Sequence, residues 1–117
     1  MILLPEGVPI YLYLGVTDMR KSIDTLSILV KEVLQLEPSS GHLFLFCNRT
    51  RNKLKALYYE ENSFTLWYRR LERGKYIFPK DGQGHIEMTR AHFEWLLSSN
   101  RYSRIDNLSD TFYENYV

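Results

Sequence analysis

The amino-acid sequence predicts an α+β fold: a single domain whose mostly antiparallel sheet is packed by one long helix and a shorter C-terminal helix. A strand-like segment, a helical one, several consecutive strand-like ones and a last helical one follow in an order typical of this class. Apolar residues repeat at helical spacing over residues 23–34 and again over residues 93–97. The 117 residues fit one domain, which we expect at residues 1–100 with both helices on one face of its sheet. Residues 101–117 form a polar tail dotted with aromatic side chains.

The first predicted strand and the long helix follow one another closely. Residues 10–14 alternate aliphatic side chains with two tyrosines, as a strand does, and Gly15 ends this strand. Thr17 or Asp18 can cap the helix that follows, with Ser22 as a later candidate. The helix carries an apolar stripe that we expect to pack on the sheet, made of Ile23, Leu26, Val30, Val33 and Leu34.

The middle of the chain is predicted to build most of the sheet. A Glu-Pro-Ser-Ser-Gly run at residues 37–41 stops the helix. Residues 42–47 are almost wholly apolar, which indicates a strand at the centre of the sheet. Residues 53–59 and 64–70 have the pattern of the two arms of a hairpin around a turn at residues 60–63.

The predicted elements after the hairpin are shorter. A tight turn at residues 73–74 leads into a short strand at residues 75–78. A Gly-rich loop at residues 81–84 then leads to an edge strand at residues 85–88. Thr89 caps the last helix.

Composition places the chain among soluble globular proteins. Apolar residues make up 44% and charged residues 25%, which is ordinary for that class. Neither a signal peptide nor a membrane-spanning stretch is recognisable, so we expect no membrane partner. The single Cys47 lies in an apolar run and cannot form a disulfide within the chain, which indicates a small buried side chain. These features favour a protein of the bacterial cytoplasm.

A strong charge asymmetry lies behind the net charge of +1. Residues 49–80 contain nine Lys and Arg against three acidic residues, a net +6, whereas the rest of the chain sums to −5. Seven aromatic residues are interleaved with these cations. Cations among flat rings on a sheet suit a phosphate backbone and exposed bases. A solvated basic face on a sheet with an aromatic core would have the same composition.

The candidate nucleic-acid-binding residues come from this basic segment and from the predicted helix start. They are Arg49, Arg51, Lys53, Lys55, Arg69, Arg70, Arg73, Lys75, Arg20 and Lys21. Four of them are expected outside the core: Arg49, Arg51, Arg69 and Arg73. Arg20 and Lys21 can instead belong to a structural helix start, and Glu72 can bridge Arg69 or Arg73 in a self-paired cluster.

Two neighbouring aromatic residues in the second hairpin arm are expected to play different parts. Trp67 and Tyr68 point to opposite faces of one strand, because side chains alternate along a strand. One of them therefore belongs to the core, and the other can stack on a ligand or form an interface.

The sequence predicts a protein that is not an enzyme and holds no metal or cofactor. The three histidines have no metal-ligand spacing with each other or with Cys47, and no phosphate-binding Gly-rich loop or Ser nucleophile elbow is recognisable. A transposase-type site needs carboxylates that converge on metal ions. Asp18, Glu72 and Asp81 are available, but a salt bridge is the simpler account of a glutamate among arginines.

Four segments in a fixed order carry a resemblance to a known family. They are residues 15–21 (Gly-Val-Thr-Asp-Met-Arg-Lys), 40–46 (Ser-Gly-His-Leu-Phe-Leu-Phe), 68–74 (Tyr-Arg-Arg-Leu-Glu-Arg-Gly) and 78–79 (Phe-Pro). Together they resemble the small TnpB-type accessory proteins of bacterial insertion-sequence family sixty-six, encoded by that element's second reading frame. The resemblance spans about residues 4–97. It implies a role in DNA transposition beside a separate, larger transposase, and it names a process rather than a reaction.

Two interpretations from different classes stay open. In the first, the chain is a nucleic-acid-binding accessory module that contacts DNA weakly, without strong sequence preference, through its basic hairpin. In the second, it is a protein-interaction module that docks the transposase or another accessory subunit through the aromatic-rich sheet face, with arginines around it. A continuous basic surface favours the first, and an apolar patch that splits the cations favours the second. The sequence is also compatible with a homodimer.

Overall fold

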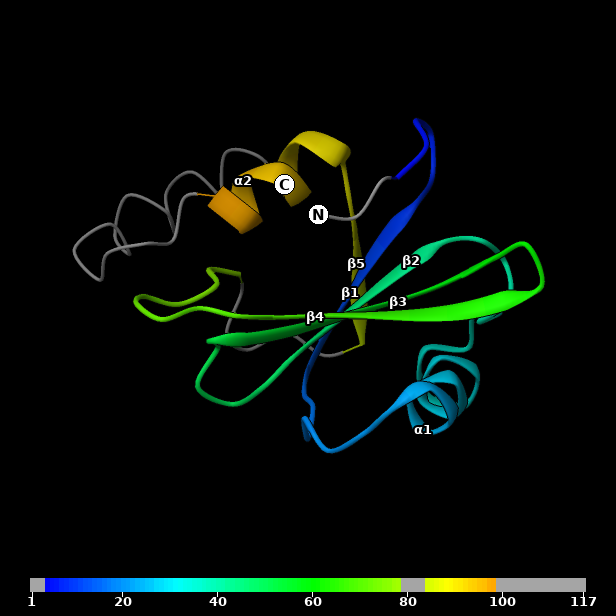
Figure 1. Ribbon diagram of the computed structural model, residues 1–117, viewed down its shortest axis with the longest axis horizontal. Helices are drawn as coiled ribbons and strands as arrows, with labels where there is room; N and C mark the ends of the chain where they lie inside the picture. The colour runs from blue at the N-terminus through cyan, green and yellow to red at the C-terminus, as the bar shows by residue number, and fades with distance from the viewer. Residues whose placement is uncertain (1–3, 79–83, 99–117) are drawn as a thin grey trace.

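The computed structural model describes residues 4–78 and 84–98, which form a five-stranded sheet with helices packed against it (Figure 1). The strands lie in the order β4-β3-β2-β1-β5. Among them β1 and β2 pair in parallel and the other neighbours pair antiparallel, so the predicted α+β class and mostly antiparallel sheet are confirmed. The elements are β1 Ile10–Val16, α1 Ile23–Leu29, the π-helix η1 Val30–Leu34, β2 Leu43–Cys47, β3 Lys53–Glu60, β4 Ser63–Arg70, β5 His85–Met88 and α2 Arg90–Ser98.

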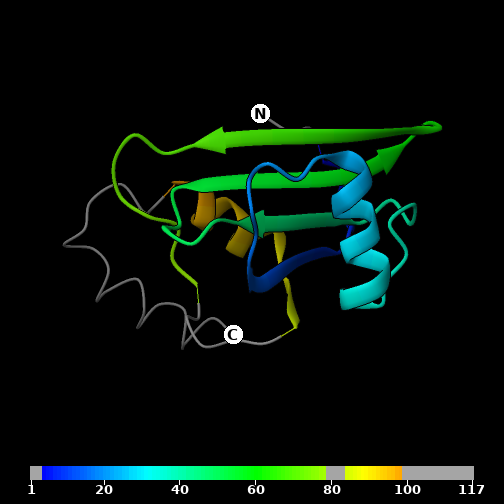
Figure 2. The ribbon, with the colours of Figure 1, turned by 90° about the horizontal axis from the view of Figure 1, so that it is seen from below.

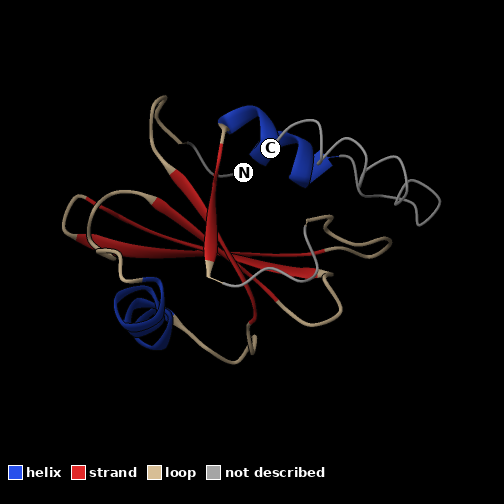
Figure 3. Ribbon diagram, turned by 180° about the vertical axis from the view of Figure 1, so that it is seen from behind, coloured by secondary structure: helices blue, strands red, loops and turns tan. Residues whose placement is uncertain are grey.

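The two helical elements cover opposite faces of the sheet, so the prediction that both lie on one face is wrong (Figures 1 and 3). The cause is β2, whose residues are all buried. Leu43, Leu45 and Cys47 point into a cluster with α2, whereas Phe44 and Phe46 point into a second cluster with α1 and η1. A strand with apolar side chains on both sides needs a cover on each face.

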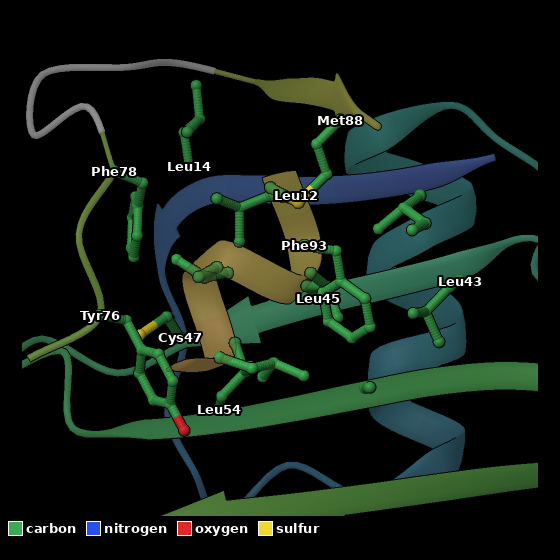
Figure 4. Close-up of a cluster of buried hydrophobic side chains, with 14 of the residues drawn as sticks. Leu12, Leu14, Leu43, Leu45, Cys47, Leu54, Tyr76, Phe78, Met88 and Phe93 are labelled. Atoms are coloured by element: carbon green, nitrogen blue, oxygen red, sulfur yellow. The ribbon is translucent and has the colours of Figure 1, made fainter. Parts of the chain in front are cut away.

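The larger hydrophobic cluster lies between the sheet and α2 (Figure 4). Residues 75–78, predicted as a strand, instead form a loop that brings Tyr76 and Phe78 into this cluster. The Tyr76 N–H donates to the carbonyl oxygen of Arg51 at 2.7 Å, a bond between two loops rather than part of a strand ladder. The apolar run predicted a strand here, but an apolar run does not show whether its residues join the sheet or pack on one of its faces.

The helix α1 begins at Ser22, the last of the three candidate caps. The Ser22 N–H donates to Oγ1 of Thr25 at 2.9 Å, and the Leu26 N–H donates to the Ser22 carbonyl oxygen at 2.9 Å. Thr17 and Asp18 therefore do not cap the helix. They belong to the segment that leaves β1 and lies across the same face of the sheet as α1 (Figure 2).

The predicted long helix changes geometry half-way, because α1 continues as the π-helix η1. Leu26, Val30 and Leu34 are buried at a spacing of four residues, while Val33 is 55% exposed. A π-turn is wider than an α-turn, so the buried face advances by more than 3.6 residues per turn. The prediction that Val33 belongs to the packed stripe is therefore wrong, although the rest of the stripe faces the sheet.

The remaining predicted elements are confirmed with small changes at their ends. The hairpin closes through two residues, Glu61 and Asn62, with φ of 50° and 62°. Two positive φ angles match a two-residue turn of type I′, which suits the twist of the flanking strands. The strand β5 pairs with β1 at the edge of the sheet. Thr89 caps α2, since its Oγ1 accepts from the His92 N–H at 3.1 Å.

The π-turn makes neighbouring residues unequal in stability, which mutagenesis can test. Leu34→Ala should lower the free energy of unfolding by about 2–5 kcal/mol, because Leu34 is packed under the sheet. Val33→Ala should change it by no more than about 0.5 kcal/mol, because the side chain lies in solvent. Urea unfolding of both variants measures the difference. A loss at Val33 as large as that at Leu34 would contradict the burial described here.

Candidate nucleic-acid interface

The candidate cations gather at one end of the sheet, called the basic end below. Strands β1 and β2 finish there, β3 begins at Lys53, and β4 finishes at Arg70. Lys53 and Arg70 stand opposite each other in the hairpin ladder, so the cations of both arms meet. The turn after β2 and the loop after β4 add four more candidates: Arg49, Arg51, Arg73 and Lys75.

The turn between β2 and β3 is organised by Asn48. Its Oδ1 accepts from the N–H groups of Asn52 at 3.1 Å and Lys53 at 3.0 Å, and its Nδ2 donates to Oγ1 of Thr50 at 3.1 Å. A side chain that satisfies the backbone of its own turn fixes the shape of that turn. Arg49, whose side chain is exposed, is thereby held at a defined place on the basic end.

Two hollows meet at this turn. One, of about 350 Å³, lies between the turn and the loop at residues 75–78. The other, of about 740 Å³, lies on the α1 face of the sheet between the turn and residues 16–20, and is called the basic groove below. The basic groove is lined by four of the candidate cations, Arg20, Arg49, Lys53 and Lys55, and by the Tyr68 ring. Arg49 lines both hollows.

Lys55 is engaged by the protein itself. Its Nζ donates to the carbonyl oxygens of Met19 at 2.8 Å and Lys21 at 2.6 Å, and it lies 5.7 Å from the centroid of the Tyr68 ring. These bonds tie the segment before α1 to the sheet. Lys55 is therefore a structural cation in the lining of the basic groove.

Arg51 is also structural, which corrects the expectation that it lies wholly outside the core. It is only partly exposed, its Nη1 donates to the carbonyl oxygen of Phe78 at 2.7 Å, and its guanidinium stacks 4.1 Å from the centroid of the Phe78 ring. Its backbone has φ of 58°, a conformation that L-residues rarely adopt. Arg51 thus anchors the loop at residues 75–78 to the turn after β2.

Two further candidates form exposed ion pairs. Arg20 Nη2 lies 2.6 Å from Asp18 Oδ2, and the Arg20 N–H donates to Asp18 Oδ1 at 2.9 Å. The hydrogen bonds from the Arg20 side chain, and then from its backbone, lower the pKa of Asp18 to about 2. Arg70 Nη2 lies 3.2 Å from Glu72 Oε1, so Glu72 pairs with Arg70 rather than with Arg69 or Arg73, the partners that the sequence suggested.

Six candidates have no such partner. Within residues 4–78 and 84–98, no hydrogen bond or ion pair engages the charged groups of Lys21, Arg49, Lys53, Arg69, Arg73 and Lys75. They do not all share one face. Arg69 stands opposite Leu54 and so points to the α2 face of the sheet, away from Lys53. The basic end therefore presents unpaired cations around the rim of the sheet rather than on one flat surface.

Trp67 and Tyr68 occupy the two roles that strand alternation predicted. Trp67 is partly buried against the cluster under α2. Tyr68 points to the α1 face, is 50% exposed and lines the basic groove. The exposed ring beside the cations is thus Tyr68, a distinction that the sequence alone left open.

The structure also shows two buried hydroxyl groups that sequence reasoning missed. Thr17 Oγ1 and Tyr76 Oη are buried, and within the described residues neither has a hydrogen-bond partner. Thr17 is in the wall of the basic groove, and its N–H donates to the Cys47 carbonyl oxygen at 2.9 Å. Burial raises the pKa of Tyr76 to about 12, with the nearby Arg69 opposing that shift. Nothing in the sequence pattern marks either hydroxyl.

The described residues offer little for metal or covalent chemistry. In residues 4–78 and 84–98, no three His, Cys, Asp or Glu side chains are grouped so that they could hold a metal ion. Burial raises the pKa of Cys47 to about 12, so its thiol stays protonated. Asp81, the third acid considered from the sequence, lies outside the described residues. No helix in the described part of the chain is long and apolar enough to cross a membrane.

Comparisons with known proteins place the chain in a family. A family model described as IS66 Orf2 like protein matches residues 8–107. An uncharacterized protein of Sinorhizobium fredii, y4hO, is 36% identical over 98 residues, which are 82% of this chain and 85% of the relative. A second uncharacterized protein of that organism, y4jC, is 28% identical over 88 residues, or 75% of each chain. No solved structure matches.

The division into structural and unpaired cations can be tested on two lysines of β3. Lys55→Met should lower the free energy of unfolding by about 1–3 kcal/mol, because two carbonyl oxygens lose a charged donor. Lys53→Met, the matched control on the same face of the strand, should change it by no more than about 0.5 kcal/mol. Chemical unfolding measures both. Equal losses would mean that the two lysines do not differ in role.

The ion pair in the lining of the basic groove should be visible in the titration of Asp18. The carboxylate stabilises the folded state above its ordinary pKa of 3.8, and this contribution is lost as the pH falls toward about 2. Arg20→Ala should move the pKa of Asp18 up toward 3.8, since the guanidinium is the main cause of the shift. Carboxyl carbon NMR shifts report this directly. An unchanged pKa in the variant would show that Arg20 does not hold Asp18.

Proposed function

Because this chain belongs to the family of IS66 Orf2-like proteins, which implies an accessory role in the transposition of an insertion sequence, we propose the following role for it in that process. It is a non-catalytic accessory protein that contacts the DNA backbone through the unpaired cations of its basic end. A separate transposase, as the resemblance implies, carries out the chemistry.

The observation that carries this proposal is the set of cations left without partners at the basic end. Four of them, Arg49, Lys53, Arg73 and Lys75, lie on the turn after β2, the start of β3 and the loop after β4. Phosphate groups supply the missing counter-charges, and binding is favoured by the release of ions that surround free DNA. Backbone contacts position a protein without reading sequence, so we expect weak binding with little sequence preference.

The acidic residues of the basic end support a role without catalysis. Asp18 and Glu72 are both occupied by ion pairs with arginines, and each lies at the surface rather than in an enclosed site. Two paired, exposed carboxylates are poor ligands for the metal ions that strand transfer requires. The protein thus contributes position and charge to the transposition complex.

One observation favours a second function, the docking of a partner protein. Ile28 and Val33 on α1 and η1 are 59% and 55% exposed, on the side turned away from the sheet. Exposed aliphatic side chains of this kind suit a protein interface. In this case the transposase or another accessory subunit covers α1 and η1, and the basic end stays free for DNA.

The salt dependence of DNA binding tests the proposal. Binding of a short duplex should fall roughly a hundredfold between about 50 and 200 mM salt, because about four phosphate contacts each release counterions. Changing Arg49, Lys53, Arg73 and Lys75 together to Ala should flatten this slope while the fold stays intact, since none of these side chains holds the structure. Fluorescence anisotropy at several salt concentrations gives the slope.

A matched control separates this site from general electrostatics. Lys31→Ala removes one exposed positive charge on η1, away from the basic end, and should leave the slope unchanged, whereas Arg49→Ala should lower it by about one contact. The same reactions with Mg²⁺ should leave the DNA uncut. Absence of binding at low salt, together with co-purification of a transposase that Ile28→Ser and Val33→Ser abolish, would replace DNA binding with the docking function.

A further inference from the structure

We propose that the basic groove holds an unpaired nucleotide, so that the protein binds single-stranded DNA more tightly than duplex DNA. This inference rests on the proposed function, because it takes DNA as the ligand of the basic end. It specifies in addition that the DNA is single-stranded and that one base lies in the basic groove. The base stacks on Tyr68, and the neighbouring phosphates lie against Arg49 and Lys53.

The Tyr68 ring is the first part of the argument. It is 50% exposed, although it lies on a face of the sheet that α1 and η1 cover elsewhere. It stands directly opposite Lys55 in the hairpin ladder, and the Lys55 ammonium lies 5.7 Å from its centroid. Because that ammonium is held by the carbonyl oxygens of Met19 and Lys21, the cation over the ring is fixed in place.

A half-exposed ring with a fixed cation in a basic groove is the arrangement that suits single strands. Proteins that bind single strands combine a positive groove, which follows the backbone, with aromatic side chains on which bases stack. In a duplex the bases are already stacked and paired, so the Tyr68 ring would gain nothing from duplex DNA. The cations alone would explain duplex binding, but they give no reason for an exposed aromatic ring in the groove.

The cations of the groove are placed to accept the phosphates of the same strand. Lys53 and Arg49 line the groove and have no partner within the described residues. Arg20, on the opposite wall, is paired with Asp18 and adds no net charge. A strand that crosses the groove therefore has its base side on Tyr68 and its backbone toward the turn after β2.

The wall of the groove contributes one further polar group. Thr17 is 1% exposed, lines the groove, and its Oγ1 has no hydrogen-bond partner in the described chain. A buried hydroxyl without a partner is unfavourable, and a polar ligand that reaches it removes that penalty. Sugar and phosphate oxygens have this chemistry, whereas an apolar peptide side chain does not.

The test compares a labelled single strand with the duplex of the same sequence, for the wild type and two variants. The wild type should bind the single strand more tightly than the duplex. Tyr68→Ala should weaken single-strand binding about 5- to 150-fold, the range for loss of one stacked base, and change duplex binding by less than about twofold. Tyr68→Phe retains the ring and should bind as the wild type does.

A second measurement does not depend on any variant. In an NMR titration of the wild-type protein with a thymidine trinucleotide, the ring protons of Tyr68 should shift upfield, because a base that stacks on the ring shields them.

Duplex binding with the expected salt slope, but with no single-strand preference and no shift at Tyr68, would overturn this inference and leave the proposed function standing. Absence of binding to either form of DNA would overturn both. Binding of an acidic peptide in the groove, with no effect of the trinucleotide, would assign the groove to a protein partner instead.

Discussion

The basic groove depends on two hydrogen bonds from the Lys55 ammonium, to the carbonyl oxygens of Met19 and Lys21. They join the third strand to the segment that enters α1, so that one wall of the basic groove is held against its floor. They also fix a positive charge beside the Tyr68 ring. Loss of these bonds would release the backbone of residues 19–21 from the sheet, whereas Val16 and Thr17 would stay tied to Cys47.

The same end of the sheet uses its cations in two ways. Lys55 and Arg51 hold loops to the sheet, each by hydrogen bonds to backbone carbonyl oxygens. Their neighbours Lys53 and Arg49 stand on the same segment and have no such bonds. The net charge of the basic segment is therefore larger than the charge that is free to contact a ligand. The charge available to a ligand is the part that the fold does not use, and that part lies around the rim of the basic end, on the turn after β2, the start of β3, the end of β4 and the loop after β4.

Elements set by local pattern were predictable from the sequence, and long-range arrangements were not. The apolar run of β2 and the alternating arms of the hairpin gave the centre of the sheet and its edge β4. The placement of helices on both faces was not predicted, because the alternation of aliphatic residues with Tyr11 and Tyr13 in β1 does not show that these tyrosines pack under α1. The exposure of Val33 was not predicted, because a π-turn cannot be recognised from the spacing of apolar residues in the sequence. The role of Lys55 depends on Met19 and Lys21, which lie 36 and 34 positions earlier in the chain, and no local sequence pattern reveals such contacts.

Mapping of DNA-induced shifts in the backbone amide spectrum of the labelled protein tests most directly that the unpaired cations of the basic end receive DNA. The account predicts shifts confined to residues 16–20, the turn after β2, the start of β3, the end of β4 and the loop after β4, with Arg49, Lys53 and Tyr68 among the largest. Residues of η1, such as Val33, should not move. Shifts concentrated on α1 and η1, with none at Arg49 or Lys53, would contradict it.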